Sequence, residues 1–197
     1  VEIVRHWGYP AESLDATTSD GYILSMIRIP HGRAQEGTAA PCNRTPILLV
    51  HGLFEDAAAF IMNPPISSAG MILADAGFDV FILNSRGTPD SQRHTNMTSD
   101  DPRFWEFTMD NMANYDVPAA IDRALQVNGA DSLYYVGHSQ GTVVAFLMLA
   151  ENPAYNAKTA QVRAMFELCP AGSLHYMKGA GRFLIELGTS FSPLFDV

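Results

Sequence analysis

Short apolar runs alternate along this chain with segments whose apolar residues recur at helical spacing. Runs bounded by glycine, proline or polar clusters are typical of strands, and longer periodic segments predict helices. The predicted strands are 22–29, 47–50, 78–83, 133–136 and 163–168; the predicted helices are 66–76, 117–127 and a segment from 142 that stops before Pro153. Strands and helices alternate from residue 47 onward, which predicts an α/β fold with a mostly parallel sheet.

Polar and glycine-rich segments predict the connections. Asp20-Gly21 indicates a turn before the strand 22–29. Residues 31–46 and 84–103 are rich in glycine, proline or polar residues and predict loops. Asp116 is expected to cap the helix that follows it, because an aspartate before an apolar helical stripe is a typical N-cap.

Composition narrows the class of protein. Hydrophobic residues make up 47% and charged residues 17% of the 197 residues, which indicates one globular domain. The net charge of −9 argues against a nucleic-acid partner, because binding to phosphates needs clustered Lys and Arg. No apolar run reaches the length of about 18 residues that a transmembrane segment needs.

The strongest chemical motif is the G-x-S-x-G sequence over residues 137–141. It stands between a predicted strand and a predicted helix, which is the context of a nucleophile elbow with Ser139 at its tip. Glycines at both ends of the motif suit a turn too tight for side chains. The alternative is an ordinary strand–turn–helix junction with an incidental serine.

An attacking serine needs hydrogen-bond donors for the oxyanion. In an elbow of this kind one donor is the backbone N–H that follows the nucleophile, here that of Gln140. The second comes from a loop after an earlier strand, and His51-Gly52-Leu53 follows the strand 47–50. We therefore predict Leu53 N–H as the second donor; an ordinary strand-to-loop turn is the alternative.

The serine also needs a base and an acid, which in this fold follow it in the order acid, then His. After Ser139 the only histidine is His175 and the only aspartate is Asp196, which is the reverse order. His138 is expected to point away from its neighbour Ser139, as consecutive side chains on a strand do. We predict that the base and acid are not in this chain. The absence of a Cys/His cluster predicts no metal site, and no cofactor is indicated.

Two cysteines and two sequons bear on the compartment. Cys42 and Cys169 are too few for a disulfide framework, and we expect free thiols. Asn43 and Asn96 each begin an N-x-Thr sequon and are predicted glycosylation sites, which favours a secretory route. Chance matches in a cytosolic protein are the alternative.

Further segments resemble the acid lipases, the family of gastric, lingual and lysosomal acid lipases and their invertebrate relatives. These segments occur in family order over about residues 5–172: Trp7-Gly8-Tyr9-Pro10, Asp20-Gly21-Tyr22-Ile23-Leu24, Arg28-Ile29-Pro30, His51-Gly52-Leu53, Leu73-Ala74-Asp75-Ala76-Gly77-Phe78-Asp79-Val80, Asn84-Ser85-Arg86-Gly87, Phe104-Trp105-Glu106-Phe107, Tyr115-Asp116-Val117-Pro118-Ala119 and Leu133-Tyr134-Tyr135-Val136-Gly137-His138-Ser139-Gln140-Gly141-Thr142.

The resemblance implies an α/β-hydrolase core that cleaves carboxylic esters of neutral lipids, such as triacylglycerols or cholesteryl esters, at a lipid–water interface. It implies Ser139 as the nucleophile, Leu53 and Gln140 as oxyanion donors, and a secreted or lysosomal glycoprotein. Asn84-Ser85-Arg86-Gly87 is interpreted as a structural turn. Phe54 stands where the family motif usually has leucine.

Family members are about twice as long, and their second half brings the cap, the final strands, the acid and the His. Residues 1–172 are therefore interpreted as the N-terminal part of the hydrolase core and 173–197 as the start of the cap. On this interpretation the chain alone is expected to be inactive. Two alternatives remain: a non-catalytic, truncated lipase-like protein, and another α/β-hydrolase esterase or thioesterase.

Overall fold

The computed structural model describes residues 1–35, 44–152 and 162–171. The strands are β1 (Glu12–Thr17), β2 (Tyr22–Ile29), β3 (Pro46–Val50), β4 (Asp79–Leu83), β5 (Arg93–His94), β6 (Leu133–His138) and β7 (Val162–Leu168). The helices are α1 (Glu2–His6), α2 (Ala69–Asp75), α3 (Met109–Asn111), α4 (Val117–Asn128) and α5 (Gln140–Glu151), with a π-helical turn over Met112–Asp116.

All these strands belong to one sheet in the order β1-β2-β4-β3-β6-β7, with β5 paired to β2. Strands β4, β3, β6 and β7 run parallel, and β1, β2 and β5 add antiparallel pairs at one side. The predicted α/β class with a mostly parallel sheet is confirmed. Parallel neighbours need crossover helices, and α2, α4 and α5 follow β3, β4 and β6 along the chain.

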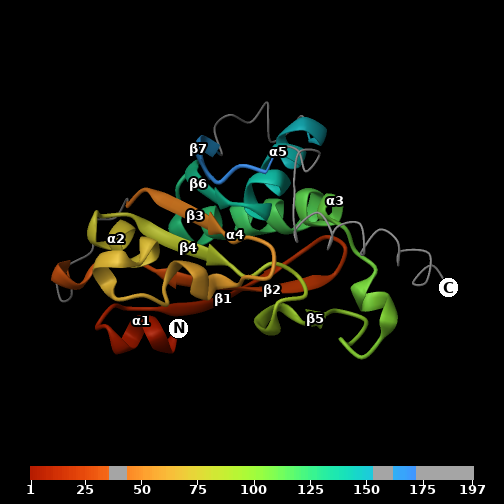
Figure 1. Ribbon diagram of the computed structural model, residues 1–197, viewed down its shortest axis with the longest axis horizontal. Helices are drawn as coiled ribbons and strands as arrows, with labels where there is room; N and C mark the ends of the chain where they lie inside the picture. The colour runs from red at the N-terminus through yellow and green to blue at the C-terminus, as the bar shows by residue number, and fades with distance from the viewer. Residues whose placement is uncertain (36–43, 153–161, 172–197) are drawn as a thin grey trace, which may run out of the picture.

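Helices cover both faces of the sheet (Figure 1). On one face, Leu48 and Val50 of β3 pack with Ile121 of α4 and Val144 of α5. On the other face, Ile47 and Leu49 belong to a second core cluster with residues of α1 and α2. Alternate residues of β3 therefore enter different cores, which explains why its sequence is apolar throughout.

Several elements differ from their prediction. Helix α2 is shorter than 66–76, because a 3₁₀ turn at Pro65–Ser67 occupies the first part of that range. Strand β1 was not predicted, since its residues are mostly exposed or half-buried and polar. The predicted loop 84–103 contains the two-residue strand β5, which pairs with Tyr22 and Ile23.

Asp116 does not cap α4, so that prediction is wrong. Its backbone is helical and its side chain makes no cap hydrogen bond, because the helix already begins at α3 and continues through the π-helical turn. Thr108 caps α3 instead, with Asn111 completing a capping box. The Asp116 carboxylate is buried and forms an ion pair with Arg86.

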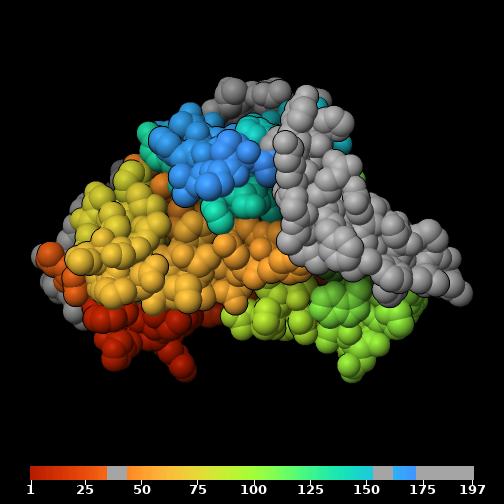
Figure 2. Space-filling view, in the orientation of Figure 1, coloured from red at the N-terminus to blue at the C-terminus, as the bar shows by residue number. Residues whose placement is uncertain are grey.

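Strand β7 is the last strand on its side of the sheet. Phe166 and Leu168 are 53% and 47% exposed, and the blue atoms of this strand lie open at the surface in the space-filling view (Figure 2). Helix α5 is also partly uncovered among the described residues, since its Phe146 is exposed.

Candidate active site

Ser139 lies in a sharp turn between β6 and α5, with backbone angles φ 49° and ψ −109°. A side chain in this region of backbone space costs about 1–3 kcal/mol, and such strain persists only where the surroundings impose it. Here Ser139 N–H donates to Leu168 O of β7 at 3.0 Å, and Ser139 O accepts from the Thr142 hydroxyl at 2.6 Å. The predicted elbow conformation is therefore present and held from both sides.

The two motif glycines are required by close approach. A Cβ on Gly137 would lie 2.8 Å from the Gly141 carbonyl carbon, and a Cβ on Gly141 would lie 2.4 Å from Val50 O. Both distances are well below van der Waals contact. The elbow helix thus packs directly on the end of β3, which places Ser139 beside the loop that leaves this strand.

Leu53 and Gln140 line one pocket of about 510 Å³. Within the described part of the chain, the backbone N–H groups of both residues make no hydrogen bond. A Cβ on Gly52 would lie only 3.1 Å from Ser139 Cβ, so the loop that carries Leu53 touches Ser139. The structure therefore brings the three sequence-predicted residues together. Aromatic and apolar side chains line much of the same pocket, among them Phe54, Trp105, Phe107 and Met112.

His51 is buried, and both of its ring nitrogens make hydrogen bonds. Its Nδ1 lies 2.8 Å from Gly52 O and its Nε2 accepts from Ser85 N–H at 3.1 Å, a pattern that fits only the neutral Nδ1–H tautomer. Burial lowers the pKa of His51 below its ordinary value of 6.5. His51 holds the loop after β3 against the loop after β4 and has no free nitrogen to serve Ser139.

His138 turns its Nδ1 to Glu55 Oε2, at 2.9 Å, and the same oxygen accepts from Gly52 N–H at 2.7 Å. Burial acts to raise the pKa of Glu55, but these two hydrogen bonds outweigh it and hold the pKa below the ordinary value. Sequence reasoning missed Glu55, because its contact with His138 joins residues far apart in the chain and no motif marks it.

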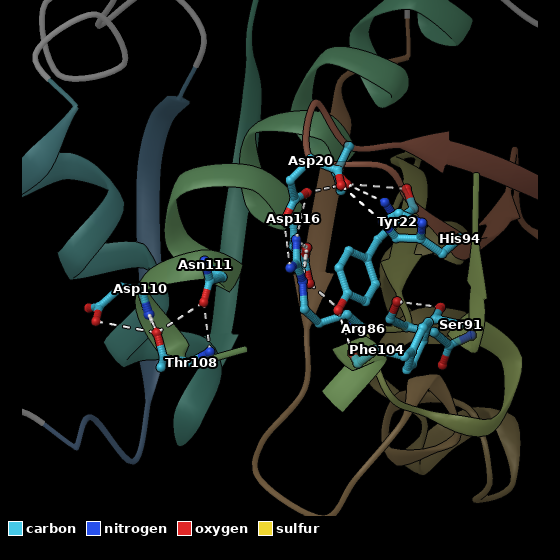
Figure 3. A network of polar contacts seen from close by, with 12 residues as sticks. Asp20, Tyr22, Arg86, Ser91, His94, Phe104, Thr108, Asp110, Asn111 and Asp116 are labelled. Carbon is cyan, nitrogen blue, oxygen red and sulfur yellow. Dashed lines mark hydrogen bonds and ion pairs between the residues drawn. The ribbon is translucent and has the colours of Figure 1, made fainter. Parts of the chain in front are cut away.

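Arg86 lines the pocket and is the centre of a largely buried ionic cluster (Figure 3). Its guanidinium pairs with Asp116 at 2.6 Å and Asp20 at 2.8 Å, and stacks over the Tyr22 ring at 3.9 Å. Burial raises the pKa of Asp116 to about 6, although Arg86 acts to lower it. The cluster ties the β1–β2 turn, the β4 loop and the start of α4 together, so the Asn84–Gly87 segment has a structural role, as predicted.

The other predicted residues lie apart from the pocket or outside the described residues. Asn96 is exposed in the loop after β5, and Cys169 is a free, exposed thiol. Asn43, Cys42, His175 and Asp196 lie outside the described residues, as does the region 173–197. Residues 1–35, 44–152 and 162–171 contain no group of three or more His, Cys, Asp or Glu side chains suited to a metal ion, and no helix there could cross a membrane.

Comparisons with known proteins agree with this geometry. Residues 1–64 match the family model of the partial alpha/beta-hydrolase lipase region, and 45–191 match that of the alpha/beta hydrolase fold. The chain is 41% identical to human lipase member K over 186 residues, 94% of this chain and 45% of the relative. The chain belongs to the acid lipase family of α/β hydrolases.

Bovine gastric triacylglycerol lipase is another relative of this acid lipase family member, 40% identical over 90% of the chain and 43% of the relative. The chain spans about half the length of the curated relatives it matches. Among solved structures, a Pyrococcus furiosus esterase superposes with a TM-score of 0.60 at 16% identity, covering 98% of this chain and 66% of the esterase. At this low identity, the superposition shows only that the esterase and this chain share a fold.

Proposed function

We propose that this chain is the N-terminal part of a carboxylic ester hydrolase that acts on neutral lipids through a serine acyl-enzyme. The observation that carries the proposal is the strained Ser139 elbow beside Leu53 and Gln140, two residues that line one pocket and whose backbone N–H groups have no partner among the described residues. Strain held in place at a half-buried turn beside a pocket is typical of functional sites.

In this mechanism Ser139 Oγ attacks the ester carbonyl carbon while a base takes its proton. The carbonyl oxygen becomes an oxyanion, which accepts hydrogen bonds from Leu53 N–H and Gln140 N–H. The tetrahedral intermediate collapses, the alcohol leaves with the proton from the base, and water then releases the acid from Ser139 by the reverse steps.

The base and acid of the triad are proposed to come from sequence other than residues 1–197. In the described part of the chain the Ser139 hydroxyl makes no hydrogen bond, and both ring nitrogens of His51 are engaged. Removing triad members leaves only residual catalysis, so we expect residues 1–197 alone to have little activity.

The pocket supports a lipid ester as substrate. Its aromatic and apolar side chains suit an acyl chain, and one relative is a gastric triacylglycerol lipase. We therefore propose triacylglycerols or cholesteryl esters, met at a lipid–water interface, and a secreted or lysosomal protein glycosylated at Asn43 and Asn96.

The test uses the full-length natural protein that contains residues 1–197. We expect hydrolysis of p-nitrophenyl butyrate and of emulsified triolein, and labelling of Ser139 by a fluorophosphonate. Ser139→Ala should abolish turnover and labelling, whereas the control Ser99→Ala should not, because only the backbone carbonyl of Ser99 makes a recorded contact. Absence of turnover in the full-length protein would favour a non-catalytic role. Hydrolysis of thioesters in preference to lipid esters would favour a thioesterase.

A further inference from the structure

The oxyanion loop, residues 51–56, is held in a strained conformation. Phe54 has φ 62°, in the left-handed region, where a non-glycine residue costs roughly 1 kcal/mol. Its side chain is 96% exposed, so packing of Phe54 does not impose this conformation. Leu53, the donor residue beside it, is also exposed. Polar contacts from neighbouring residues must therefore hold the loop.

Glu55 supplies such contacts and joins the loop to the elbow. Its Oε2 accepts from Gly52 N–H at 2.7 Å, next to the donor residue Leu53, and lies 2.9 Å from Nδ1 of His138, next to the nucleophile Ser139. A carboxylate only accepts hydrogen bonds, so His138 carries its proton on Nδ1. One oxygen therefore links the strand end before the nucleophile to the loop that bears the donor.

The space around Gly52 shows how tightly these groups meet. A Cβ on Gly52 would lie 2.9 Å from Glu55 Oε2, 3.1 Å from His138 Nδ1 and 3.1 Å from Ser139 Cβ. The loop backbone is thus in contact with the nucleophile on one side and with the Glu55 bridge on the other. A shift of the loop changes the distance from Leu53 N–H to an oxyanion formed at Ser139.

We propose that Glu55 is a positioning residue that fixes Leu53 N–H relative to Ser139. The inference rests on the function proposed above, in which Leu53 N–H stabilises the oxyanion. Glu55 acts through Gly52 and His138 and touches no substrate atom. Because the oxyanion exists only along the reaction path, a misplaced donor lowers kcat and leaves KM nearly unchanged.

The experiment compares Glu55→Ala, Glu55→Asp and Glu55→Gln in the full-length protein with p-nitrophenyl butyrate. We expect Glu55→Ala to lower kcat about 10- to 100-fold, since displacing a catalytic group by about 1 Å can cost that much. Glu55→Asp is one methylene too short to keep both contacts, so it should lose activity as well. Glu55→Gln should retain most of kcat, because its amide oxygen accepts the same two N–H groups.

Glu12→Ala is the matched control, because Glu12 also accepts a side-chain hydrogen bond, from Arg28 at 3.0 Å, but on β1. It should keep kcat and KM. Hydrogen exchange of a peptide over 51–56 should quicken in Glu55→Ala and not in Glu12→Ala. If Glu55→Ala does not fold, Glu55→Asp decides the matter, because it keeps the charge.

The outcomes separate the two proposals. Turnover that depends on Ser139, with unchanged kcat in Glu55→Ala or Glu55→Asp, overturns the inference alone. An effect confined to KM, or a loss in Glu55→Gln as large as in Glu55→Ala, overturns it too. Turnover that persists in Ser139→Ala, or is absent from the full-length protein, overturns the proposed function and the inference with it.

Discussion

Replacing Ser139 by glycine separates the conformational cost of the elbow from its chemistry. At φ 49° and ψ −109° the serine Cβ is strained, and glycine at this position is not. The variant Ser139→Ala removes the hydroxyl but keeps the Cβ, so it keeps the strain. The difference in stability between the two variants therefore measures the effect of the backbone conformation at residue 139, without the effect of the hydroxyl.

The magnitude follows from two opposing effects. Relief of the strain stabilises the fold by about 1–3 kcal/mol. The greater freedom of glycine in the unfolded chain costs about 0.4–1 kcal/mol. We expect the free energy of unfolding of Ser139→Gly to exceed that of Ser139→Ala by roughly 1 kcal/mol. Ser139→Ala itself should differ little from wild type, because the Ser139 hydroxyl makes no hydrogen bond in the described residues.

The assay is urea unfolding followed by circular dichroism, with thermal melts as a second measurement. Both variants of the full-length protein should be inactive towards p-nitrophenyl butyrate, whereas only Ser139→Gly should gain stability. If Ser139→Gly is less stable than Ser139→Ala, the elbow is not strained and the structural basis of the proposed nucleophile is wrong.

Other variants test the surroundings of the elbow. Gly141→Ala places a Cβ 2.4 Å from Val50 O, so it should lower the melting temperature and abolish activity, whereas loss of neither would refute the close packing. Asp116→Ala leaves the buried Arg86 with one carboxylate fewer and should lower the free energy of unfolding in urea by roughly 3 kcal/mol. An unchanged free energy of unfolding would mean that Arg86 finds another partner. His51 is neutral in the fold with a lowered pKa, so its contribution to stability is complete above pH 6.5 and is lost as the pH falls below that value through the folded pKa. Unfolding curves from pH 7.5 to 5 should therefore show a steeper loss of stability for wild type than for His51→Gln, and parallel curves would contradict the assignment.

The sequence-based predictions succeeded where the signal is local. Strand β2 begins and ends at the predicted residues, because a turn and a proline flank an apolar run. The roles of Ser139, Leu53 and Gln140 stay predictions, but their positions near the ends of two buried strands could be predicted for the same reason. Leu53 and Gln140 line one pocket, and Ser139 lies beside it, because β3 and β6 are parallel neighbours in the sheet.

The failures concern long-range partners. Asp116 was expected to cap a helix, but the buried Arg86 guanidinium draws its carboxylate into an ion pair across the fold. Glu55 looked like one acidic residue among many, because its partner His138 belongs to a different strand end. Strand β1 has little apolar pattern and exists because it pairs with β2. No local pattern records such contacts.

The hydrogen bond from Ser139 N–H to Leu168 O has a consequence for the order in which the molecule is made. Protein chains emerge from the ribosome N-terminus first, at about 5–20 residues per second. The elbow sequence therefore leaves the exit tunnel before the strand that fastens it. Until β7 docks beside β6, one of the bonds that holds Ser139 in its strained turn is missing. The strained turn is consequently completed late, after the nascent chain has passed Leu168, and a stalled product that ends before Leu168 lacks this hydrogen bond.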